Sequence, residues 1–272
     1  MSGADLTLAI EWARAEGWNP GRRDADAFYP ADPLGFLAGT LDGRMIASIS
    51  AVRYGAEYGF IGFYIVAREW RGRGFGTRLW QAAMQRLENV ACIGLDGVLK
   101  EEVSYRKSGF VTAYRNRRYG GRAPASTADA AVTDARTVPF ADLAALDRAL
   151  FPARRDAFLE PWIALDGHRA LAMAVDGKLV GFGVARPCVQ GFKIGPLYAD
   201  ARTTAERLLR ALCAGMGEEP VFLDVPEVNR PAVAFAESLG WTVSFETVRM
   251  YRGSAPAVDL KRLYGVTTFE LG

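Results

Sequence analysis

Apolar and polar positions alternate in two pairs of segments, one pair in each half of the chain, and this alternation predicts β-strands. In the first half, the turn signal Asp-Gly-Arg at 42–44 is followed by strand-like residues 45–54, and a second apolar stretch covers 59–67. The second half repeats this order at 176–178, 179–188 and 191–199. Each half is therefore predicted to contain neighbouring strands joined by tight turns.

An amphipathic helix is predicted after each pair of strands, because apolar residues recur there every three or four positions. A short apolar strand follows each helix, ending at Asp96 in the first half and containing Asp224 in the second. Each strand leads into another short helix closed by a glycine, Gly109 or Gly240, which can adopt the left-handed conformation that ends helices. The apolar helix positions are Leu79, Trp80, Ala83, Met84 and Leu87 in the first half and Leu208, Leu209 and Leu212 in the second.

This order of elements predicts an α/β (α+β) chain of two tandem domains, each with a mixed, mainly antiparallel central sheet flanked by helices. Residues 121–131, GRAPASTADAA, are rich in small and turn-forming residues and lack any large apolar side chain, so they are predicted to form a linker. We therefore expect a first domain at 1–120, a linker at 121–131 and a second domain at 132–272.

Composition excludes several classes of function. Basic and acidic residues nearly balance at a formal net charge of +2, and no long basic run is present, so nucleic acid is not the expected partner. No apolar stretch is long enough to span a bilayer, and the first residues lack the pattern of a secretory signal. We expect a cytoplasmic protein that acts on a small molecule and does not bind membranes.

Three cysteines and one histidine limit the chemistry further. Cys92, Cys188 and Cys213 are far apart in the sequence, which favours buried thiols over a disulfide framework or a zinc site. His168 lies in a turn-like run and is predicted to be a surface loop residue. One histidine cannot build a histidine-rich metal site, so we expect no metal and a chemistry of carboxylates, phenols, backbone groups and a bound cofactor.

The most specific motif is a glycine-rich turn between a predicted strand and a predicted helix. Glycines let the backbone approach a ligand closely, and the N–H groups and dipole at a helix N-terminus favour a diphosphate. Nearby guanidinium groups add positive charge. The turn comprises Arg71, Gly72, Arg73, Gly74, Phe75 and Gly76, with the helix expected to start at Thr77 and to carry Arg78.

Two other interpretations of this turn are open. The glycines can simply make a tight connection with solvated arginines around it. Alternatively, the turn belongs to a dinucleotide-binding unit in which Asp96, about twenty residues beyond Gly76, binds a ribose. The spacing G-x-G-x-G lacks the final glycine of that fingerprint, however, and the turn follows two hairpin-like strands near the middle of a domain.

These residues resemble the GNAT acetyltransferases, whose diphosphate loop follows the pattern Arg/Gln-x-x-Gly-x-Gly/Ala. Arg71, Gly74 and Gly76 match that pattern, and Tyr105, four residues before the Gly-Phe pair at 109–110, matches the closing motif of the family. Further segments, such as GPLYAD and the terminal MYRG, look like a bacterial-type tandem GNAT subfamily. The resemblance covers nearly the whole chain and implies an N-acetyltransferase that uses acetyl-CoA (coenzyme A) and a small-molecule amine.

Two departures from the family pattern change what we expect of each half. GNAT domains usually open with a strand, whereas here the predicted helix LTLAIEWARAEG comes almost at once. In the second half no glycine occurs between Gly195 and Gly215, where a phosphate loop would lie, and Ala236 stands at the position that matches Tyr105. The second half is therefore expected to be a degenerate copy that shapes the substrate pocket or a homodimer interface.

The resemblance also implies a mechanism. Tyr64, Ile65 and Val66 would contact the pantetheine arm, and a backbone N–H near Val66 would stabilise the oxyanion. Tyr105 is the candidate acid that protonates the departing thiolate, and its alternative role is packing against the cofactor without proton transfer.

An amine with a pKa of about 10 must lose a proton before it attacks, so a base is required. Asp96 is the preferred candidate because it ends a strand that flanks the cofactor, and the alternative is that it caps the following helix. Glu57 and Glu69 are weaker candidates that are expected to be solvated turn residues.

Aromatic residues beside a carboxylate in the N-terminal segment suit recognition of an ammonium group. The predicted substrate residues are Trp18, Asp24, Phe28, Tyr29 and, from the second half, Asp224. Burial of the three aromatic residues in the core is the alternative. At the level of the whole protein, the enzyme competes with a non-catalytic acyl-CoA sensor, an interaction scaffold and a dinucleotide-binding protein.

Overall fold

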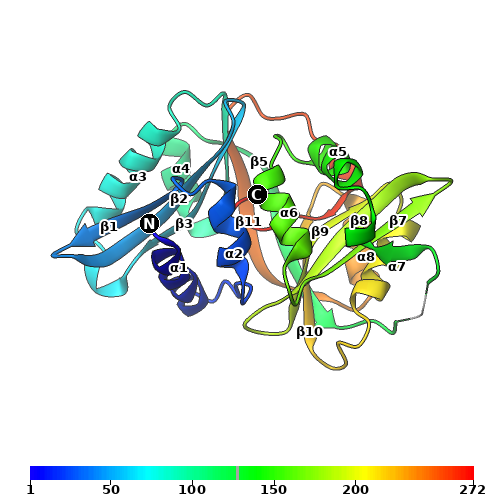
Figure 1. Cartoon of the computed structure of the whole chain (residues 1–272). Coiled ribbons are helices and arrows are strands. Elements are labelled where there is room, and N and C mark those ends of the chain that lie inside the picture. The colour runs from blue at the N-terminus through cyan, green and yellow to red at the C-terminus, as the bar shows by residue number, and fades with distance from the viewer. Residues whose placement is uncertain (127–128) are drawn as a thin grey trace.

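The computed structural model describes residues 1–126 and 129–272. In Figure 1 the first half lies on the left, the second half on the right, and the C-terminus between them. The predicted linker at 121–131 begins inside a strand that continues to Arg122, and its positions 127–128 lie outside the described residues. The boundaries 1–120 and 132–272 thus stay a prediction.

The predicted order of elements is confirmed in the first half. Asp42 and Gly43 both have positive φ, 50° and 76°, as the predicted hairpin turn requires. The elements are α1 (Gly3–Ala15), α2 (Asp24–Ala31), β1 (Phe36–Leu41), β2 (Arg44–Tyr54), β3 (Tyr58–Val66), α3 (Phe75–Arg86), β4 (Cys92–Val98), α4 (Glu102–Lys107) and β5 (Val111–Arg122), with short 3-10 turns at Arg68–Trp70 and Leu99–Glu101.

The second half repeats this order and adds a short strand at each end. Asp176 and Gly177 form the same turn as Asp42 and Gly43, with φ of 50° and 75°. The elements are β6 (Val132–Asp134), α5 (Phe140–Leu150), α6 (Asp156–Ala164), β7 (Arg169–Val175), β8 (Lys178–Pro187), β9 (Phe192–Ala199), α7 (Arg202–Leu212), β10 (Pro220–Pro226), α8 (Arg230–Ser238), β11 (Thr242–Gly253) and β12 (Leu263–Gly265), with 3-10 turns at Ala135–Thr137 and Leu260–Arg262.

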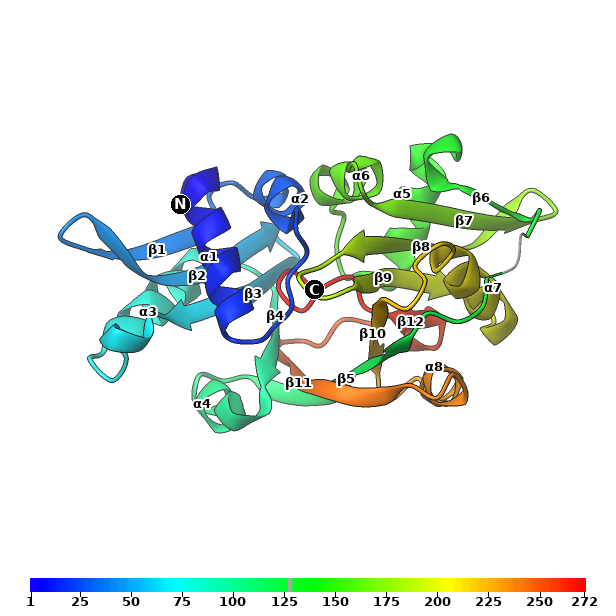
Figure 2. The same cartoon turned by 90° about the horizontal axis from the view of Figure 1, so that it is seen from below.

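The strands of both halves form one continuous sheet. Its order is β1-β2-β3-β4-β11-β5-β10-β9-β8-β7-β6, and β12 pairs with β9. The last long strand of each half is therefore exchanged: β11 lies between β4 and β5, and β5 lies between β11 and β10. Figure 2 shows the two exchanged strands running beside each other beneath both halves. The periodicity of the sequence did not predict this exchange.

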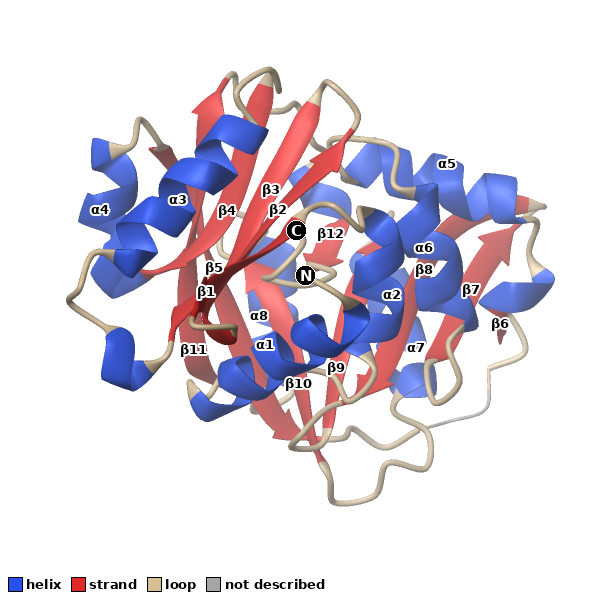
Figure 3. Cartoon of the chain, turned by 60° about the vertical axis from the view of Figure 1, so that its left-hand side comes forward, coloured by secondary structure: helices blue, strands red, loops and turns tan. Residues whose placement is uncertain are grey.

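Helices cover both faces of the sheet (Figure 3). One face carries α1, α2, α5 and α6, whose apolar residues form a core that joins the two halves. Phe28 of α2 stacks on Trp162 of α6 there, with ring centroids 5.9 Å apart. The opposite face has a separate core for each half, under α3 in the first and under α7 and α8 in the second.

Two buried ion pairs accompany the strand exchange. Arg249 of β11 lies opposite Asp96 of β4 and donates to both carboxylate oxygens at 2.8 and 2.5 Å. Arg118 of β5 lies opposite Asp224 of β10 and donates to both oxygens at 2.7 and 2.8 Å. Each half thus places an arginine of its exchanged strand on an aspartate of the other half, and all four side chains are at most 6% exposed.

The parallel strands of each half pair over part of their length only. The β3–β4 ladder ends at Ile61 and Leu95, although both strands continue. In the second half, the β9–β10 ladder ends at Ile194 and Leu223.

Strand β12 lies beside the second half's unpaired segments. It pairs with β9, and the N–H of Val266 donates to the carbonyl oxygen of Asp224 at 2.9 Å. The C-terminal tail, residues 266–272, then runs back toward the first half.

Burial corrects the prediction for His168 and confirms that for the cysteines. His168 is 6% exposed, its ring meets Trp162 edge-on, and its Nδ1 lies 2.8 Å from the carbonyl oxygen of Trp162. The surface-loop prediction was wrong because the turn that carries the residue folds back over α6. The three cysteines are buried and unpaired, as predicted.

Burial lowers the pKa of His168 to about 4, and the nearby Arg186 acts in the same direction. The imidazole of the unfolded chain binds its proton more tightly, with a pKa of about 6.5. The contribution of neutral His168 to the free energy of unfolding is therefore fully present above that pH and is lost as the pH falls toward 4. We predict a loss of about 2 kcal/mol in the free energy of unfolding between pH 7 and pH 5 from this group.

Urea unfolding at the two pH values measures that loss, and His168→Gln provides the matched baseline. The chain has one histidine, so its imidazole NMR signals can be followed without overlap. Equal pH dependence in both proteins, or an imidazole that titrates near 6.5, would contradict the prediction.

Asp96→Asn should lower the free energy of unfolding by about 3 kcal/mol or more, because it leaves the Arg249 charge buried without its partner. The matched control is Asp26→Asn, whose pair with Arg23 is about half exposed and is expected to contribute less than about 1 kcal/mol. Urea unfolding at pH 7 compares the two variants. Similar losses in the free energy of unfolding of both variants would show that the buried Asp96–Arg249 pair contributes little to stability.

Candidate active site

A pocket with about 330 Å³ of space occupies the unpaired region between β3 and β4. The first half contributes residues from the end of α1, from both strands and from α4. The second half contributes Phe245 and Thr247 from β11, and Phe269 and Glu270 from the C-terminal tail. The pocket therefore lies where the two halves meet.

A bulge in β3 opens this pocket. Phe63 has a positive φ of 47°, and the register between β2 and β3 shifts between Ser48 and Ser50. The hydroxyl of Ser48 donates to the carbonyl oxygen of Phe63 at 2.8 Å and so holds the bulge in place. Beyond it, Tyr64, Ile65 and Val66 line the pocket without pairing to β4.

The glycine-rich turn connects this strand to α3 as predicted, although the helix begins at Phe75 rather than at Thr77. Gly72 and Gly74 have φ of 73° and 80°, which favours glycine. In the described part of the chain, the N–H groups of residues 72–77 have no acceptor. These donors at a helix N-terminus suit an anion.

Gly76 is required for a different reason. A Cβ at that position would lie 2.8 Å from the hydroxyl of Tyr64. The helix and the strand can approach each other at this point because residue 76 has no side chain.

The arginines of the turn are held by protein groups. Arg71 donates to the carbonyl oxygen of Val66 at 2.8 Å and to the carboxylate of Glu16 at 2.6 Å, so it ties the turn to the end of α1. Arg73 lies over the ring of Trp70, 4.9 Å from its centroid. Arg71 and Arg73 therefore shape the turn, and the backbone N–H groups remain the feature that suits an anion.

Tyr105 of α4 lines the pocket across β4. A Cβ at Gly97 would collide with its ring, so the glycine lets the phenol lie directly on the strand. Trp80 packs beside it at 5.5 Å between centroids. Burial, with contributions from Glu101 and Tyr64, raises the pKa of Tyr105, so the phenol stays protonated at neutral pH.

Asp96, the predicted base, is among the residues that line the pocket, but its carboxylate is occupied by protein groups. The side chain is fully buried, bound to Arg249 and to the amide of Asn116 at 2.8 Å. Burial raises the pKa of this carboxyl, and Arg249 and Asn116 oppose that rise. The following turn has no side-chain cap, so the alternative role as a helix cap is not observed either. The geometry favours a structural role for Asp96.

Of the five predicted substrate residues, Trp18 lines the pocket, and its carbonyl oxygen accepts from Arg118 at 2.8 Å. Asp24 is buried against Arg186 at 3.1 Å, and Phe28 lies in the core between the halves. The remaining two lie elsewhere: Tyr29 stacks on Phe36, and Asp224 pairs with Arg118.

The two weaker base candidates lie outside the pocket. Glu57 pairs with Arg148 at 3.1 Å on the surface, and Glu69 is exposed in the 3-10 turn after β3.

Sequence reasoning missed the wall that the second half supplies, and Glu270 in particular. Glu270 is 3% exposed and is among the residues that line the pocket, and its Oε2 has no hydrogen-bond partner among the described residues. Burial raises the pKa of Glu270. Neither periodicity nor a motif marked it, because the tail after β12 has no regular secondary structure.

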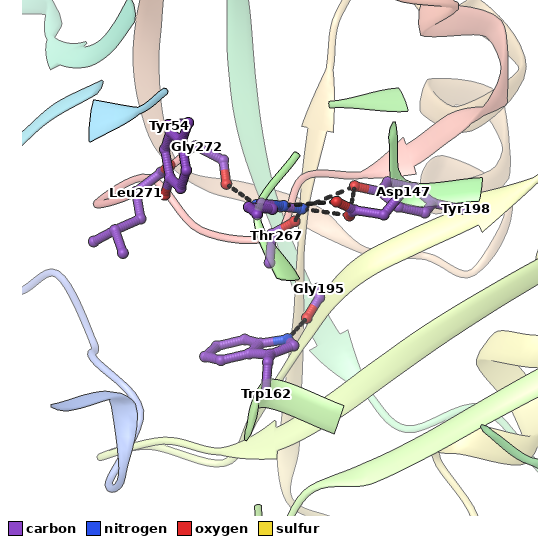
Figure 4. A network of polar contacts seen from close by, with 9 residues as sticks. Tyr54, Asp147, Trp162, Gly195, Tyr198, Thr267, Leu271 and Gly272 are labelled. Carbon is purple, nitrogen blue, oxygen red and sulfur yellow. Dashed lines mark hydrogen bonds and ion pairs between the residues drawn. The ribbon is translucent and has the colours of Figure 1, made fainter. Parts of the chain in front are cut away.

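Hydrogen bonds fix the C-terminal tail in place (Figure 4). Arg155 donates to the hydroxyl of Thr267 at 2.7 Å and to the carbonyl oxygen of Gly272 at 3.1 Å, and pairs with Asp147. The hydroxyl of Tyr54, from the first half, donates to the carbonyl oxygen of Leu271 at 3.0 Å. The tail is therefore a built part of the pocket wall.

The described residues contain no cluster of histidine, cysteine or acidic side chains that could hold a metal ion. Within the same residues, none of the helices is both long enough and apolar enough to cross a bilayer.

The sequence matches the model of the Acetyltransferase (GNAT) family over residues 6–110 and that of an Acetyltransferase (GNAT) domain over residues 143–265. Holothin acyltransferase from Pseudoalteromonas sp. (strain SANK 73390) is 30% identical over 267 residues, which cover 97% of this chain and 90% of that protein. The uncharacterized N-acetyltransferase YitH of Bacillus subtilis (strain 168) is 27% identical over 85% of this chain and 83% of its own length.

Solved structures share the fold. A structure from Pyrococcus horikoshii has a TM-score of 0.84 at 23% identity and covers 100% of this chain and 94% of its own. A tandem GNAT protein from the clavulanic acid biosynthesis pathway has a TM-score of 0.59 at 15% identity, over 94% of this chain and 98% of its own. With two family matches in tandem and a relative that aligns along nearly its full length, the chain belongs to the GNAT acetyltransferase family and is an acyltransferase.

Proposed function

We propose that this protein transfers the acetyl group of acetyl-CoA to a primary amine of a small molecule. One observation carries the proposal: the N–H groups of residues 72–77, which lack acceptors in the described structure, lie next to the pocket that Tyr105 lines. A diphosphate at these donors and a thioester in the pocket are the arrangement that such a transfer requires.

The residues present fit acetyl-CoA. Its diphosphate suits the donors and the helix dipole at the start of α3, where Gly72 and Gly74 leave space for a ligand. Its pantetheine arm suits the unpaired edge of β3 at Tyr64, Ile65 and Val66. When bound, acetyl-CoA supplies an acetyl group activated as a thioester.

Two groups of the chain would then act on the reaction. A backbone N–H near Val66 stabilises negative charge on the carbonyl oxygen, because the unpaired edge of β3 directs peptide groups into the pocket. Tyr105 donates its proton to the departing sulfur. The raised pKa of the phenol keeps the donor form present across the physiological range.

Under this proposal the two halves have different roles. Residues 1–120 hold the cosubstrate, and residues 132–272 supply the wall that faces the acceptor. The second half has no glycine-rich turn before α7, which begins directly after Ala201, and β12 lies against its parallel strands. A small acceptor is also in keeping with the relative named holothin acyltransferase.

The test is the release of coenzyme A thiol from acetyl-CoA with a panel of aliphatic and aromatic primary amines. The acetylated product is identified by mass spectrometry. Thermal stabilisation by coenzyme A without thiol release by any amine would instead support a sensor of acyl-CoA.

Gly74→Val should weaken coenzyme A binding by about 100-fold, because a side chain there strains the positive φ and blocks at least two charge-assisted hydrogen bonds of about 1.5 kcal/mol each. The matched control is Gly43→Val, which has φ of 76° in an exposed turn far from the pocket. Isothermal titration calorimetry measures both affinities. Retained affinity in Gly74→Val would overturn the assignment of the turn.

Tyr105→Phe should lower kcat by about 100-fold or more with nearly unchanged coenzyme A affinity, since it removes the proton donor and keeps the ring. The control is Tyr29→Phe, which removes a phenol outside the pocket. Steady-state kinetics and calorimetry give the two parameters. Unaltered turnover would leave Tyr105 with a packing role alone.

A further inference from the structure

Glu270 differs from the other buried carboxylates around the junction of the halves. Asp96, Asp224 and Asp24 each lie within 3.1 Å of an arginine nitrogen. Glu270 forms no ion pair among the described residues, and its Oε2, like the Oδ1 of Asp24, lacks a hydrogen-bond partner. A buried carboxylate left in this condition carries a large desolvation cost unless a ligand pairs with it.

The charges that face Glu270 do not supply that partner. Lys193 of β9 donates to the carbonyl oxygen of Trp18 at 3.1 Å, and Arg118 of β5 is bound to Asp224. Arg186 of β8 is bound to Asp24 of α2. The residues that β3 and β11 contribute to the pocket are uncharged at neutral pH.

The rest of the wall shows which ligand fits. Thr247 provides a second buried oxygen without a partner, so the pocket has two unsatisfied groups that can accept from a donor. Trp18, Phe245 and Phe269 line the same pocket. A primary ammonium has three N–H donors, and an aromatic body packs well against aromatic side chains.

We propose that Glu270 binds the ammonium group of the acceptor and takes its proton, and that the acceptor is a primary amine carried on an aromatic body. This inference rests on the proposed function and adds the substrate class and the residue that receives it. The second half then supplies the acceptor site through its C-terminal tail.

The proton balance is complete with the groups named. Glu270 accepts one proton from the ammonium and releases it to solvent after the reaction. The nitrogen lone pair forms the C–N bond, and the C–S bond breaks. Tyr105 gives its proton to the sulfur. The second proton that leaves the nitrogen then returns to the oxygen of Tyr105.

The rise in the pKa of Glu270 is caused first by burial and then by the charge of Asp24, and it is opposed by Lys193, Arg186 and Arg118. It makes the carboxylate a stronger base than an exposed glutamate. Its ionised form increases as the pH rises through that raised value. Activity with an amine should therefore rise over the same range.

The first experiment measures binding without acetyl-CoA, by titration calorimetry of the full chain with 2-phenylethylamine and with the uncharged 2-phenylethanol. The wild type should bind the amine at least about 10-fold more tightly than the alcohol, and Glu270→Gln should remove that preference. Glu246→Gln, which changes a carboxylate paired with Arg117 outside the pocket, should keep it. No preference in the wild type, or an equal preference in Glu270→Gln, would overturn the proposal.

The second experiment follows kcat/KM for amine acetylation against pH. Glu270→Gln should lower it by about 100-fold and abolish its rise with the ionisation of Glu270, whereas Glu270→Asp should retain a rise. Unfolding of Glu270→Gln by urea at neutral pH checks its fold, and an isosteric amide should be at least as stable as the buried carboxylate.

The two proposals fail in different ways. A wild type that neither binds acetyl-CoA nor acetylates any amine would contradict the proposed function. A wild type that acetylates amines, together with a Glu270→Gln variant of unchanged pH profile, would contradict the role of Glu270 alone.

Discussion

The exchange of β5 and β11, with its two buried ion pairs, is the constraint on which the rest of the structure depends. Each half completes the sheet of the other, and each exchanged strand places an arginine on an aspartate across the junction. Because a buried charge without its partner is costly, neither half can move away while the other keeps its contacts. The pocket walls are consequently held in one relative position.

Both halves contain the same arrangement of two parallel strands, but it is left open in the first half and covered in the second. In both, a pair of parallel strands stops pairing before it ends. The first half leaves this region open and follows β3 with a glycine-rich turn that presents N–H groups. The second half follows β9 directly with α7 and packs β12 beside the same strands. The two halves thus differ: the first leaves its strand edge open to the pocket, and the second contributes part of the pocket wall.

The part of the pocket wall that the second half contributes contains a buried carboxylate in an unfavourable environment. Glu270 is buried without an ion pair, while Arg155, Tyr54 and Thr267 fix the tail that carries it. A rigid tail that holds an unsatisfied carboxylate is typical of a functional site, since stability alone would favour an amide or an apolar residue there. The proposed site therefore depends on residues far apart in the chain.

Local patterns in the sequence determined the strands, the two Asp-Gly turns, the glycine-rich turn and the helix that carries Tyr105. Periodicity and turn chemistry act over a few residues, so they can be detected without the fold. Only the tertiary structure decided which groups surround Asp96, Asp24, Asp224 and Glu270. The partner of Asp96 lies 153 residues away, and that of Asp224 lies 106 residues away. A carboxylate acts as a base or as half of an ion pair according to what packs against it, and the strand exchange that brings those partners together leaves no local signal in the sequence.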